Sequence, residues 1–412
     1  MELPVLNVRT TAIDDPGSLI EWTHPMRPAV FLRNGDGIIG FGERARYQHS
    51  GGNRVADIAR WWRDISSAAL VHDEVGLPGT GLVGLGSFAF SDTSTEASVL
   101  TIPSVIVGRR DGRSWITTVD GGMPVSSQRL GPQPRDQLGP GSFTPLEPGA
   151  HTPDGYRASI EAALREIAAG RVSKVVLARD LVGSIPAMSD RRWVITRLAE
   201  AYPDTFTFAV DGLLGSSPET LVRVRDGEMT ARVLAGTAGR LADPTDDAAV
   251  ASTLGASRKN RSEHELAVRG VLDSLAPHAT GVMNTEPFAL QLPNLWHLAT
   301  DVRGSLCDGR TALDLVAALH PTAAVAGVPT DAALALIAEL EPRDRGRYAG
   351  PVGWVDGTGD GEWAIALRCA SIDEEGVVTA WAGAGIVAGS DPEKELAETD
   401  LKFRPMVDAL ER

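Results

Sequence analysis

The amino-acid sequence predicts an α+β protein built on two or more largely antiparallel β-sheets. Two observations lead to this prediction. Short alternating apolar runs are separated by Gly, Asp and Pro, as in strands joined by hairpins, and amphipathic helical segments stand between sets of these runs. The sequence contains neither an internal repeat nor a glycine-rich nucleotide-binding loop.

Composition narrows the class of protein. The chain has 412 residues, 43% hydrophobic and 23% charged, which is typical of a globular protein with a sizeable core. Its 39 Lys and Arg against 54 Asp and Glu give a net charge of −15, which repels nucleic acid and anionic membranes. Cys307 and Cys369 do not form a disulfide or zinc pattern, and no signal peptide or membrane-length apolar stretch is visible. We therefore expect a cytoplasmic protein without nucleic-acid or membrane partners.

The first part of the chain consists mainly of short strands. Apolar runs at 29–42, 81–90, 98–110 and 114–122 carry strand patterns, and an amphipathic helix near Val55 to Leu70 interrupts them. A Pro/Gly-rich passage from Leu130 to Gly155 predicts a surface connection to the rest of the chain.

The remaining elements can be read in order. Ile160, Leu164 and Ile167 share one face of a helix, which a strand at 173–183 follows. Asp226-Gly227 suits the positive φ angles of a tight turn and joins two alternating runs into a hairpin. Further patterns predict a helix at about 260–275, a hairpin around 357–361, a strand at 377–387, and a C-terminal helix capped by Ser390 with Glu393.

The C-terminal helix carries acidic residues at helical spacing. Glu395, Glu398 and Lys402 project from one face, and Glu263 lies on the helix at about 260–275. If the two helices meet, three carboxylates converge on one hard cation, for which Mg²⁺ is the favoured ion. The alternative is a solvated helix face.

Two further residues are candidates for acid–base chemistry. Lys174 stands among β-branched residues at the start of a strand, where burial lowers the pKa of an amine toward that of a usable base. Glu219 ends a small-residue loop before a strand, where apolar surroundings would keep its carboxyl protonated. The alternatives are an edge-strand lysine that reaches water and a surface turn acid.

Several residues could hold an anion. Arg368 is a charge within an apolar strand, Tyr348 lies opposite it in the predicted hairpin, and guanidinium matches a carboxylate bidentately. Gly383 to Gly385 and the Gly236-Thr237 pair could offer backbone N–H groups. Plain turns and a structural salt bridge are the alternatives, and His297 and His320 are typical of core or turn histidines.

Nine segments, taken in order, resemble the chorismate-utilising enzyme family across roughly Tyr156 to Leu410. Several unrelated motifs in one order make the resemblance specific. They are SKVVLAR, GSSPETLVR, LAGTAGR, SRKNRSEHE, LPNLWHLAT, LHPTAAVAG, RGRYAGPVGW, AIALRCA and GAGIVAGSDPEKELAETDLK.

The resemblance implies a fold and a set of roles. We expect a single domain over 1–412, with a two-sheet core flanked by helices, a variable N-terminal half (1–145) that completes the sheets, and a chorismate-binding portion (150–412). Lys174 matches the lysine that activates an attacking water, and Glu219 matches the acid that protonates the departing ring hydroxyl. The positions matching metal-site acids are Glu263, Glu395 and Glu398. Those matching substrate-holding residues are Gly236, Thr237, His297, Ala324, Tyr348, Arg368, Gly383 and Lys402.

The members of the family differ in the nucleophile that attacks the ring of the substrate. Aminating members use ammonia from a glutaminase partner and generally lack a lysine at the position of Lys174, and aminodeoxychorismate synthases place a lysine where this chain has Ala235. Salicylate synthases share the lysine but tend to have threonine where Ala324 stands. The resemblance therefore implies an isochorismate synthase, although Ala323 and Ala326 depart from the usual proline and serine.

Partners follow from this choice. We expect chorismate as the small-molecule substrate, Mg²⁺ as the cofactor, no glutaminase subunit, and a monomer, because no heptad seam demands a partner. The alternatives are salicylate synthesis, an aminating synthase of the same family, and a homologue that only binds a dicarboxylate. Whether the product enters menaquinone or siderophore biosynthesis depends on neighbouring enzymes.

Overall fold

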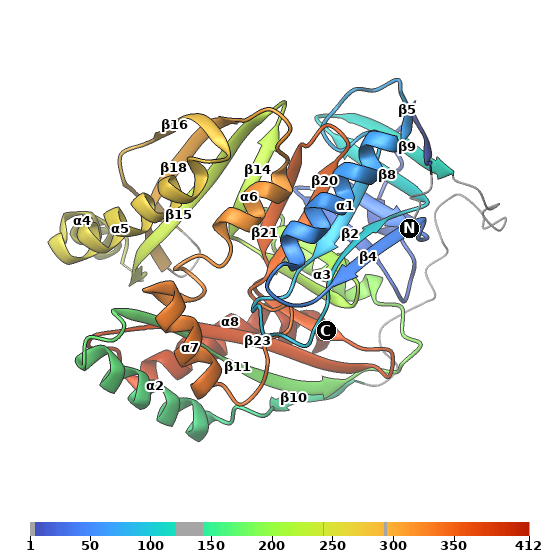
Figure 1. Cartoon of the computed structure of the whole chain (residues 1–412). Helices are drawn as coiled ribbons and strands as arrows, with labels where there is room; N and C mark the ends of the chain where they lie inside the picture. The colour runs from blue at the N-terminus through green and yellow to red at the C-terminus, as the bar shows by residue number, and fades with distance from the viewer. Residues whose placement is uncertain (1–4, 121–142, 242, 292–294, 412) are drawn as a thin grey trace.

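The structure confirms the predicted α+β architecture (Figure 1). It is a computed structural model, and it describes residues 5–120, 143–241, 243–291 and 295–411. Two large sheets form the body of the molecule, one of 13 strands and one of 10. Every strand pairing within the described ranges is antiparallel except that of β1 (Asn7–Ile13) with β5 (Leu70–Asp73).

The larger sheet joins strands from both ends of the chain. Its order is β10 (Thr144–Pro148), β11 (Lys174–Ser184), β23 (Val377–Val387), β22 (Cys369–Ile372), β13 (Leu213–Ser217), β12 (Phe206–Val210), β2 (Ala29–Arg33), β3 (Asp36–Phe41), β8 (Val105–Arg110), β9 (Arg113–Asp120), β1 and β5, with β19 (Gly327–Val328) beside β11. Strands from the N-terminal part of the chain therefore continue the sheet that strands from the C-terminal part form.

The smaller sheet is likewise shared. Its order is β16 (Ala279–Asn284), β18 (Leu295–Leu306), β15 (Glu228–Gly239), β14 (Thr220–Arg225), β21 (Gly361–Ile365), β20 (Pro351–Asp356), β6 (Val83–Ser87), β7 (Ser98–Ile102) and β4 (Ala45–His49), with β17 (Phe288–Gln291) beside β18. The predicted hairpin β14–β15 turns at Asp226 and Gly227, whose φ angles are +53° and +75°.

Helices cover the outer faces of the sheets. Against the smaller sheet pack α1 (Arg54–Ala68), α4 (Pro244–Ala256), α5 (Arg258–Leu275) and α6 (Ala312–Leu319), and against the larger sheet pack α2 (Pro153–Ala168), α3 (Arg192–Ala201), α7 (Thr330–Leu340) and α8 (Pro392–Glu411). A short 3₁₀ helix lies at Leu19–Trp22. None of the helices in the described ranges combines the length and apolar character needed to cross a bilayer.

Two strands pass side by side from one sheet to the other. β13 belongs to the larger sheet and β14 to the smaller, so residues 218–219 cross between them; residues 366–368 cross back from β21 to β22. The crossings are hydrogen-bonded to each other, because Ile365 N–H donates to the Glu219 carbonyl at 3.0 Å and Ser216 N–H donates to the Arg368 carbonyl at 3.1 Å. These two crossings carry Glu219 and Arg368.

Four local predictions were wrong. Arg368 does not lie within a strand but in the crossing between β21 and β22, where its φ is +50°. Tyr348 does not lie opposite Arg368 in the hairpin β20–β21, because it precedes that hairpin. Gly383 to Gly385 lie inside β23 and do not follow it. The side chain that caps α8 is Asp391, which accepts from the N–H groups of Glu393 and Lys394. A further prediction, the surface connection, holds in part: Thr144–Pro148 is mostly exposed, as expected, but forms strand β10, and residues 130–142 lie outside the described ranges.

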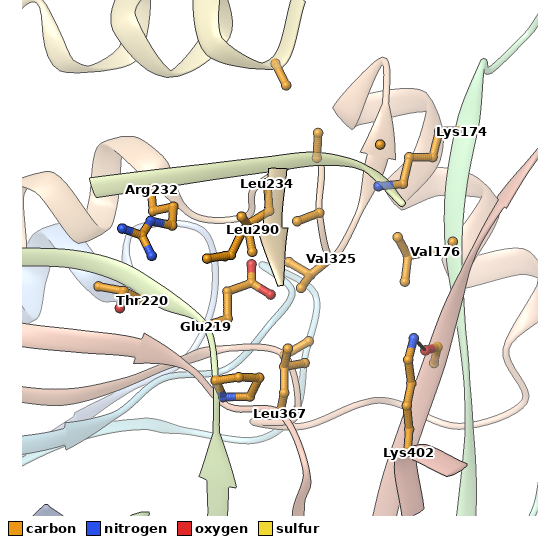
Figure 2. A pocket seen from close by; sticks show the side chains of 18 of the residues that line it. Lys174, Val176, Glu219, Thr220, Arg232, Leu234, Leu290, Val325, Leu367 and Lys402 are labelled. Atoms are coloured by element: carbon orange, nitrogen blue, oxygen red, sulfur yellow. Dashed lines mark hydrogen bonds between the residues drawn. The ribbon is translucent and has the colours of Figure 1, made fainter. Parts of the chain in front are cut away.

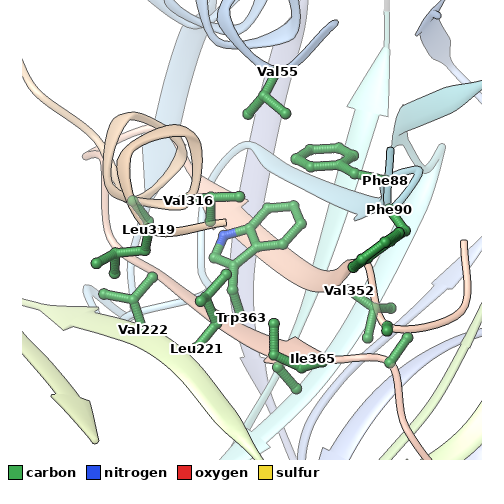
Figure 3. Close-up of a cluster of buried hydrophobic side chains, with 14 of the residues drawn as sticks. Val55, Phe88, Phe90, Leu221, Val222, Val316, Leu319, Val352, Trp363 and Ile365 are labelled. Atoms are coloured by element: carbon green, nitrogen blue, oxygen red, sulfur yellow. The ribbon is translucent and has the colours of Figure 1, made fainter. Parts of the chain in front are cut away.

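Trp363 lies at the centre of an apolar cluster between the smaller sheet and its helices (Figure 3). Its side chain is fully buried and is surrounded by Val316 and Leu319 of α6, Val55 of α1 and Phe88. Gly86 makes room for the indole, because a Cβ there would lie 2.7 Å from its ring. The ring stacks obliquely on Phe88 at a centroid separation of 4.8 Å.

We predict that Trp363→Ala lowers the free energy of unfolding by about 3–5 kcal/mol, because the cavity left behind cannot collapse fully. Chemical denaturation of both proteins measures the difference. Met188→Ala is the matched control, since this side chain is 74% exposed and should change stability by no more than about 0.5 kcal/mol. Equal losses for both variants would contradict the assigned packing.

Candidate active site

A cavity of about 790 Å³ is lined by residues of both sheets together with α5 and α8. Its size falls within the range of small-molecule sites. Ten of the residues singled out from the sequence line it: Lys174, Glu219, Gly236, Ala324, Tyr348, Arg368, Gly383, Glu395, Glu398 and Lys402. The structure therefore brings together side chains that are up to 228 positions apart, as from Lys174 to Lys402.

Lys174 is the first residue of β11 and reaches into the cavity (Figure 2). On the neighbouring strand β23, Gly385 provides the space for its side chain. A Cβ at that position would lie 3.1 Å from Lys174 Cε and 3.8 Å from Nζ. The glycine therefore determines where the amine can lie.

Glu219 enters the same cavity from the crossing between β13 and β14. Figure 2 shows its carboxyl group between Arg232 on one side and Lys174 and Lys402 on the other. Burial raises the pKa of Glu219 above its ordinary value of 4.5, and the charges of Lys174, Lys402 and Arg368 oppose this rise. The protonated form is thereby favoured in a site that is otherwise rich in cations.

Lys402 and Arg368 form a cationic wall of the cavity. The Lys402 ammonium donates to the Gly383 carbonyl at 2.7 Å and forms an ion pair with Glu398 at 2.6 Å. Burial and the nearby Arg368 lower the pKa of Lys402, whereas Glu398 raises it. Burial lowers the pKa of Arg368 too, although guanidinium stays charged at neutral pH. Two cations held this close favour a dianionic ligand.

Tyr348 closes the cavity beside Gly383. Its ring stacks on Trp381 at a centroid separation of 5.7 Å, and burial raises the pKa of its phenol. A Cβ on Gly383 would lie 3.2 Å from the Tyr348 hydroxyl, so the glycine again admits a polar side chain. The phenol thus remains protonated and able to donate a hydrogen bond.

Glu395 and Glu398 line the cavity from successive turns of α8. Burial and the charge of Glu398 raise the pKa of Glu395, whereas a hydrogen bond to Ser390 lowers it. Two hard oxygen ligands that repel each other fit a divalent cation such as Mg²⁺, which would offset the repulsion. Among the described side chains, no group of three or more potential ligands is arranged around a metal position.

Three of the predicted site residues are described by their backbone alone. Glu263 lies on α5, and Thr237 and His297 pair across β15 and β18. The side chains of all three lie outside the described residues. Gly236, which precedes Thr237, has a φ of +87° and lies in a β-bulge, where two residues of β15 oppose one of β18.

The two described histidines near the site are structural. His264 on α5 is fully buried and hydrogen-bonds Thr300 at 2.7 Å. Burial lowers the pKa of His320 to about 3, and its ring contacts the Ala349 carbonyl at 3.1 Å. Ala324, four residues further on, lines the cavity wall.

A buried ion pair at the wall of the cavity was not predicted from the sequence. Arg345 pairs with Glu341, and both side chains are almost fully buried. Arg345 donates to the Val176 and Val325 carbonyls at 2.7 and 3.0 Å, and Glu341 accepts from Ala178 N–H at 2.8 Å. The pair connects the strand that begins at Lys174 with the loop that contains Ala324. Both residues follow the end of α7, in irregular backbone, so no helical spacing in the sequence signalled the pair.

The family model for chorismate-binding enzymes matches residues 6–411 of the chain. The chain belongs to the chorismate-binding enzyme family. Isochorismate synthase DhbC of Bacillus subtilis is 40% identical over 271 residues, which cover 63% of this chain and 68% of DhbC. MenF of Mycobacterium tuberculosis strain H37Rv is 39% identical over 347 residues, which cover 81% of this chain and 87% of that protein.

Solved structures of this family are similar as well. The menaquinone-specific isochorismate synthase MenF from Escherichia coli superposes with a TM-score of 0.78 at 26% identity, covering 99% of this chain and 95% of that one. The resemblance read from the sequence motifs is therefore confirmed at the level of the family and of the chorismate-binding fold.

The raised pKa of Glu219 predicts a pH-dependent stability. A carboxyl whose pKa is raised by folding stabilises the protein below its unfolded pKa of about 4.5 and loses this contribution as the pH rises through the folded value. Relative to the parent, Glu219→Gln should therefore be more stable at pH 7–8, and the difference should vanish near pH 4. Thermal midpoints measured across this range test the prediction.

Glu265→Gln, on the exposed surface of α5, controls for the loss of a carboxylate. A Glu219→Gln variant that is destabilised at pH 8 and matches the parent only at low pH would show the opposite sign, and would mean that the neighbouring cations outweigh burial.

Proposed function

We propose that this chain is an isochorismate synthase, an isomerase that converts chorismate to isochorismate by adding water and releasing the ring hydroxyl. The observation that supports this most is the placement of Lys174 and Glu219 in one cavity, beside the cations Arg368 and Lys402. Relatives named as isochorismate synthases, such as DhbC at 40% identity, support the same reaction.

The reaction needs a base at one ring carbon and an acid at another. In the proposed step, the Lys174 ammonium first releases a proton to solvent, and the neutral amine then accepts a proton from water as the water oxygen bonds to the ring. The protonated carboxyl of Glu219 donates its proton to the departing hydroxyl, which leaves as water. One water enters and one leaves, so substrate and product are isomers, and solvent returns the proton from Lys174 to Glu219.

The cationic wall provides the substrate contacts. Arg368, Lys402 and the backbone near Gly383 would hold the carboxylates, and Tyr348 would donate a hydrogen bond. Glu395 and Glu398, with Glu263 expected from the sequence, would hold Mg²⁺, which would supply a positive charge for a substrate carboxylate when bound. The protein's own residues perform the proton transfers.

A proton NMR time course with purified protein, chorismate and Mg²⁺ tests the function directly. We expect isochorismate to accumulate, with turnover that requires Mg²⁺ and does not require ammonia. Salicylate with pyruvate would indicate the salicylate synthase alternative, and strict dependence on ammonia would indicate an aminating synthase. An inactive protein that still binds chorismate would indicate a binding-only homologue.

The proposed roles of the acid and the base predict large losses of turnover. Lys174→Ala and Glu219→Gln should each lower kcat by roughly 10²–10⁴-fold, because each removes one proton transfer from the transition state. Chorismate binding, measured by calorimetry, should persist in both variants. Retention of more than a tenth of the parental kcat by either variant would contradict its assigned role.

Gly385→Ala tests the position of the amine. The added methyl group would lie 3.1 Å from Lys174 Cε, so the lysine must shift, and we expect kcat to fall about tenfold. Gly255→Ala on α4 is the matched control, because a Cβ there meets no atom within 4 Å. A Gly385→Ala variant as active as the control would mean that the amine position is unimportant.

A further inference from the structure

Six arginines line the cavity. Arg368 belongs to the cationic wall and Arg345 is paired with Glu341, which leaves four without a part in the proposed chemistry. Arg223 on β14, Arg232 on β15 and Arg303 on β18 belong to the smaller sheet, and Arg33 ends β2 of the larger sheet. In the strand register Arg223 lies opposite Thr230, and Thr230 lies opposite Arg303, so these residues form a cross-strand row. Three different strands of one sheet thus present cations to the same cavity.

Only half of these cations are neutralised by an ion pair. Arg223 pairs with Glu362, and Arg232 pairs with Asp301 through bonds of 2.6 and 3.0 Å. Within the described residues, Arg33 and Arg303 have no ion-pair partner, although Arg33 donates to the Asp204 carbonyl at 2.9 Å and lies near the Asp204 carboxylate. With Asp204 counted and the Glu219 carboxyl protonated, three carboxylates face four guanidinium groups.

The remaining positive charge is unexpected in a chain with a net charge of −15. Burial and the neighbouring Arg223 lower the pKa of Arg33, as expected where guanidinium groups crowd together. Figure 2 shows Arg232 on the side of Glu219 away from Lys174 and Lys402. Arg232 therefore lies on the side of Glu219 away from the cationic wall that would hold the bound substrate, and Arg223 and Arg303 lie on the two strands that flank its own strand β15.

We propose that Arg33, Arg223, Arg232 and Arg303 form an outer anion site that draws a dicarboxylate into the cavity before it reaches Arg368 and Lys402. The inference rests on the proposed function, because that function supplies the dianionic substrate. Without this site, the acidic surface would repel the substrate from the cavity.

An outer site of this kind has a defined kinetic signature. A charge that does not touch the reacting atoms stabilises the bound ground state and the transition state equally, so its loss raises KM and leaves kcat unchanged. For a charge reversal roughly 10 Å from a dianion, KM should rise about tenfold at 0.01 M salt and about threefold at 0.1 M.

The test compares Arg303→Glu and Arg33→Glu with the parent at 0.01 and 0.1 M KCl, with the Mg²⁺ concentration held constant. Arg303→Lys keeps the charge and should retain the parental KM. Arg9→Glu is the matched control, because Arg9 is an exposed arginine on β1 whose side chain is 68% accessible and does not line the cavity. Thermal midpoints show that each variant is folded.

A salt-dependent rise in KM for both glutamate variants, absent in Arg9→Glu and Arg303→Lys, supports the proposal. Parental KM values in the glutamate variants would overturn it, as would a fall in kcat at constant KM or an Arg303→Lys variant as impaired as Arg303→Glu. Formation of isochorismate by the parent protein is scored separately, so failure of the outer site leaves the proposed function intact.

Discussion

The paired crossing between the two sheets is the constraint on which the cavity depends. Strand β13 passes into β14 and strand β21 passes back into β22, and backbone hydrogen bonds hold the two crossings together at Ile365 with Glu219 and at Ser216 with Arg368. Because strands leave one sheet for the other here, residues of both sheets line one cavity. The residues within the crossings cannot point into a regular sheet face, and they supply an acid and a cation to the cavity.

Burial and charge act in opposite directions within this cavity. Desolvation raises the pKa of Glu219, whereas the surrounding Lys174, Lys402 and Arg368 lower it. An acid that must donate a proton near cations needs this balance to favour its neutral form. Glycines on β23 make the arrangement possible, since a side chain at Gly383 or Gly385 would crowd Tyr348 or Lys174.

Many helices, strands and turns could be predicted from the sequence, because the residue patterns that specify them lie within short segments. The turn at Asp226 and Gly227, the helix faces of α2 and α5, and the strand that begins at Lys174 all follow from patterns within about 15 residues. The family motifs extended this to the site, since they named ten residues that line one cavity.

Non-local features could not be predicted in the same way. The left-handed backbone at Arg368 arises where the chain changes sheets, and an apolar run with one charge reads as a strand. The pair Arg345–Glu341 and the row of Arg223 with Arg303 depend on strand neighbours from distant parts of the chain. Register between such strands is set by tertiary packing, which periodicity within one segment does not encode.

The central claim is that solvent water attacks the ring on the side of Lys174 while the original hydroxyl leaves toward Glu219. Conversion of chorismate in water enriched in ¹⁸O, followed by mass spectrometry of isochorismate, tests it most directly. We expect one ¹⁸O atom in each newly formed isochorismate molecule. Unlabelled isochorismate would mean that the hydroxyl migrates within the substrate, and would contradict the assigned base and acid.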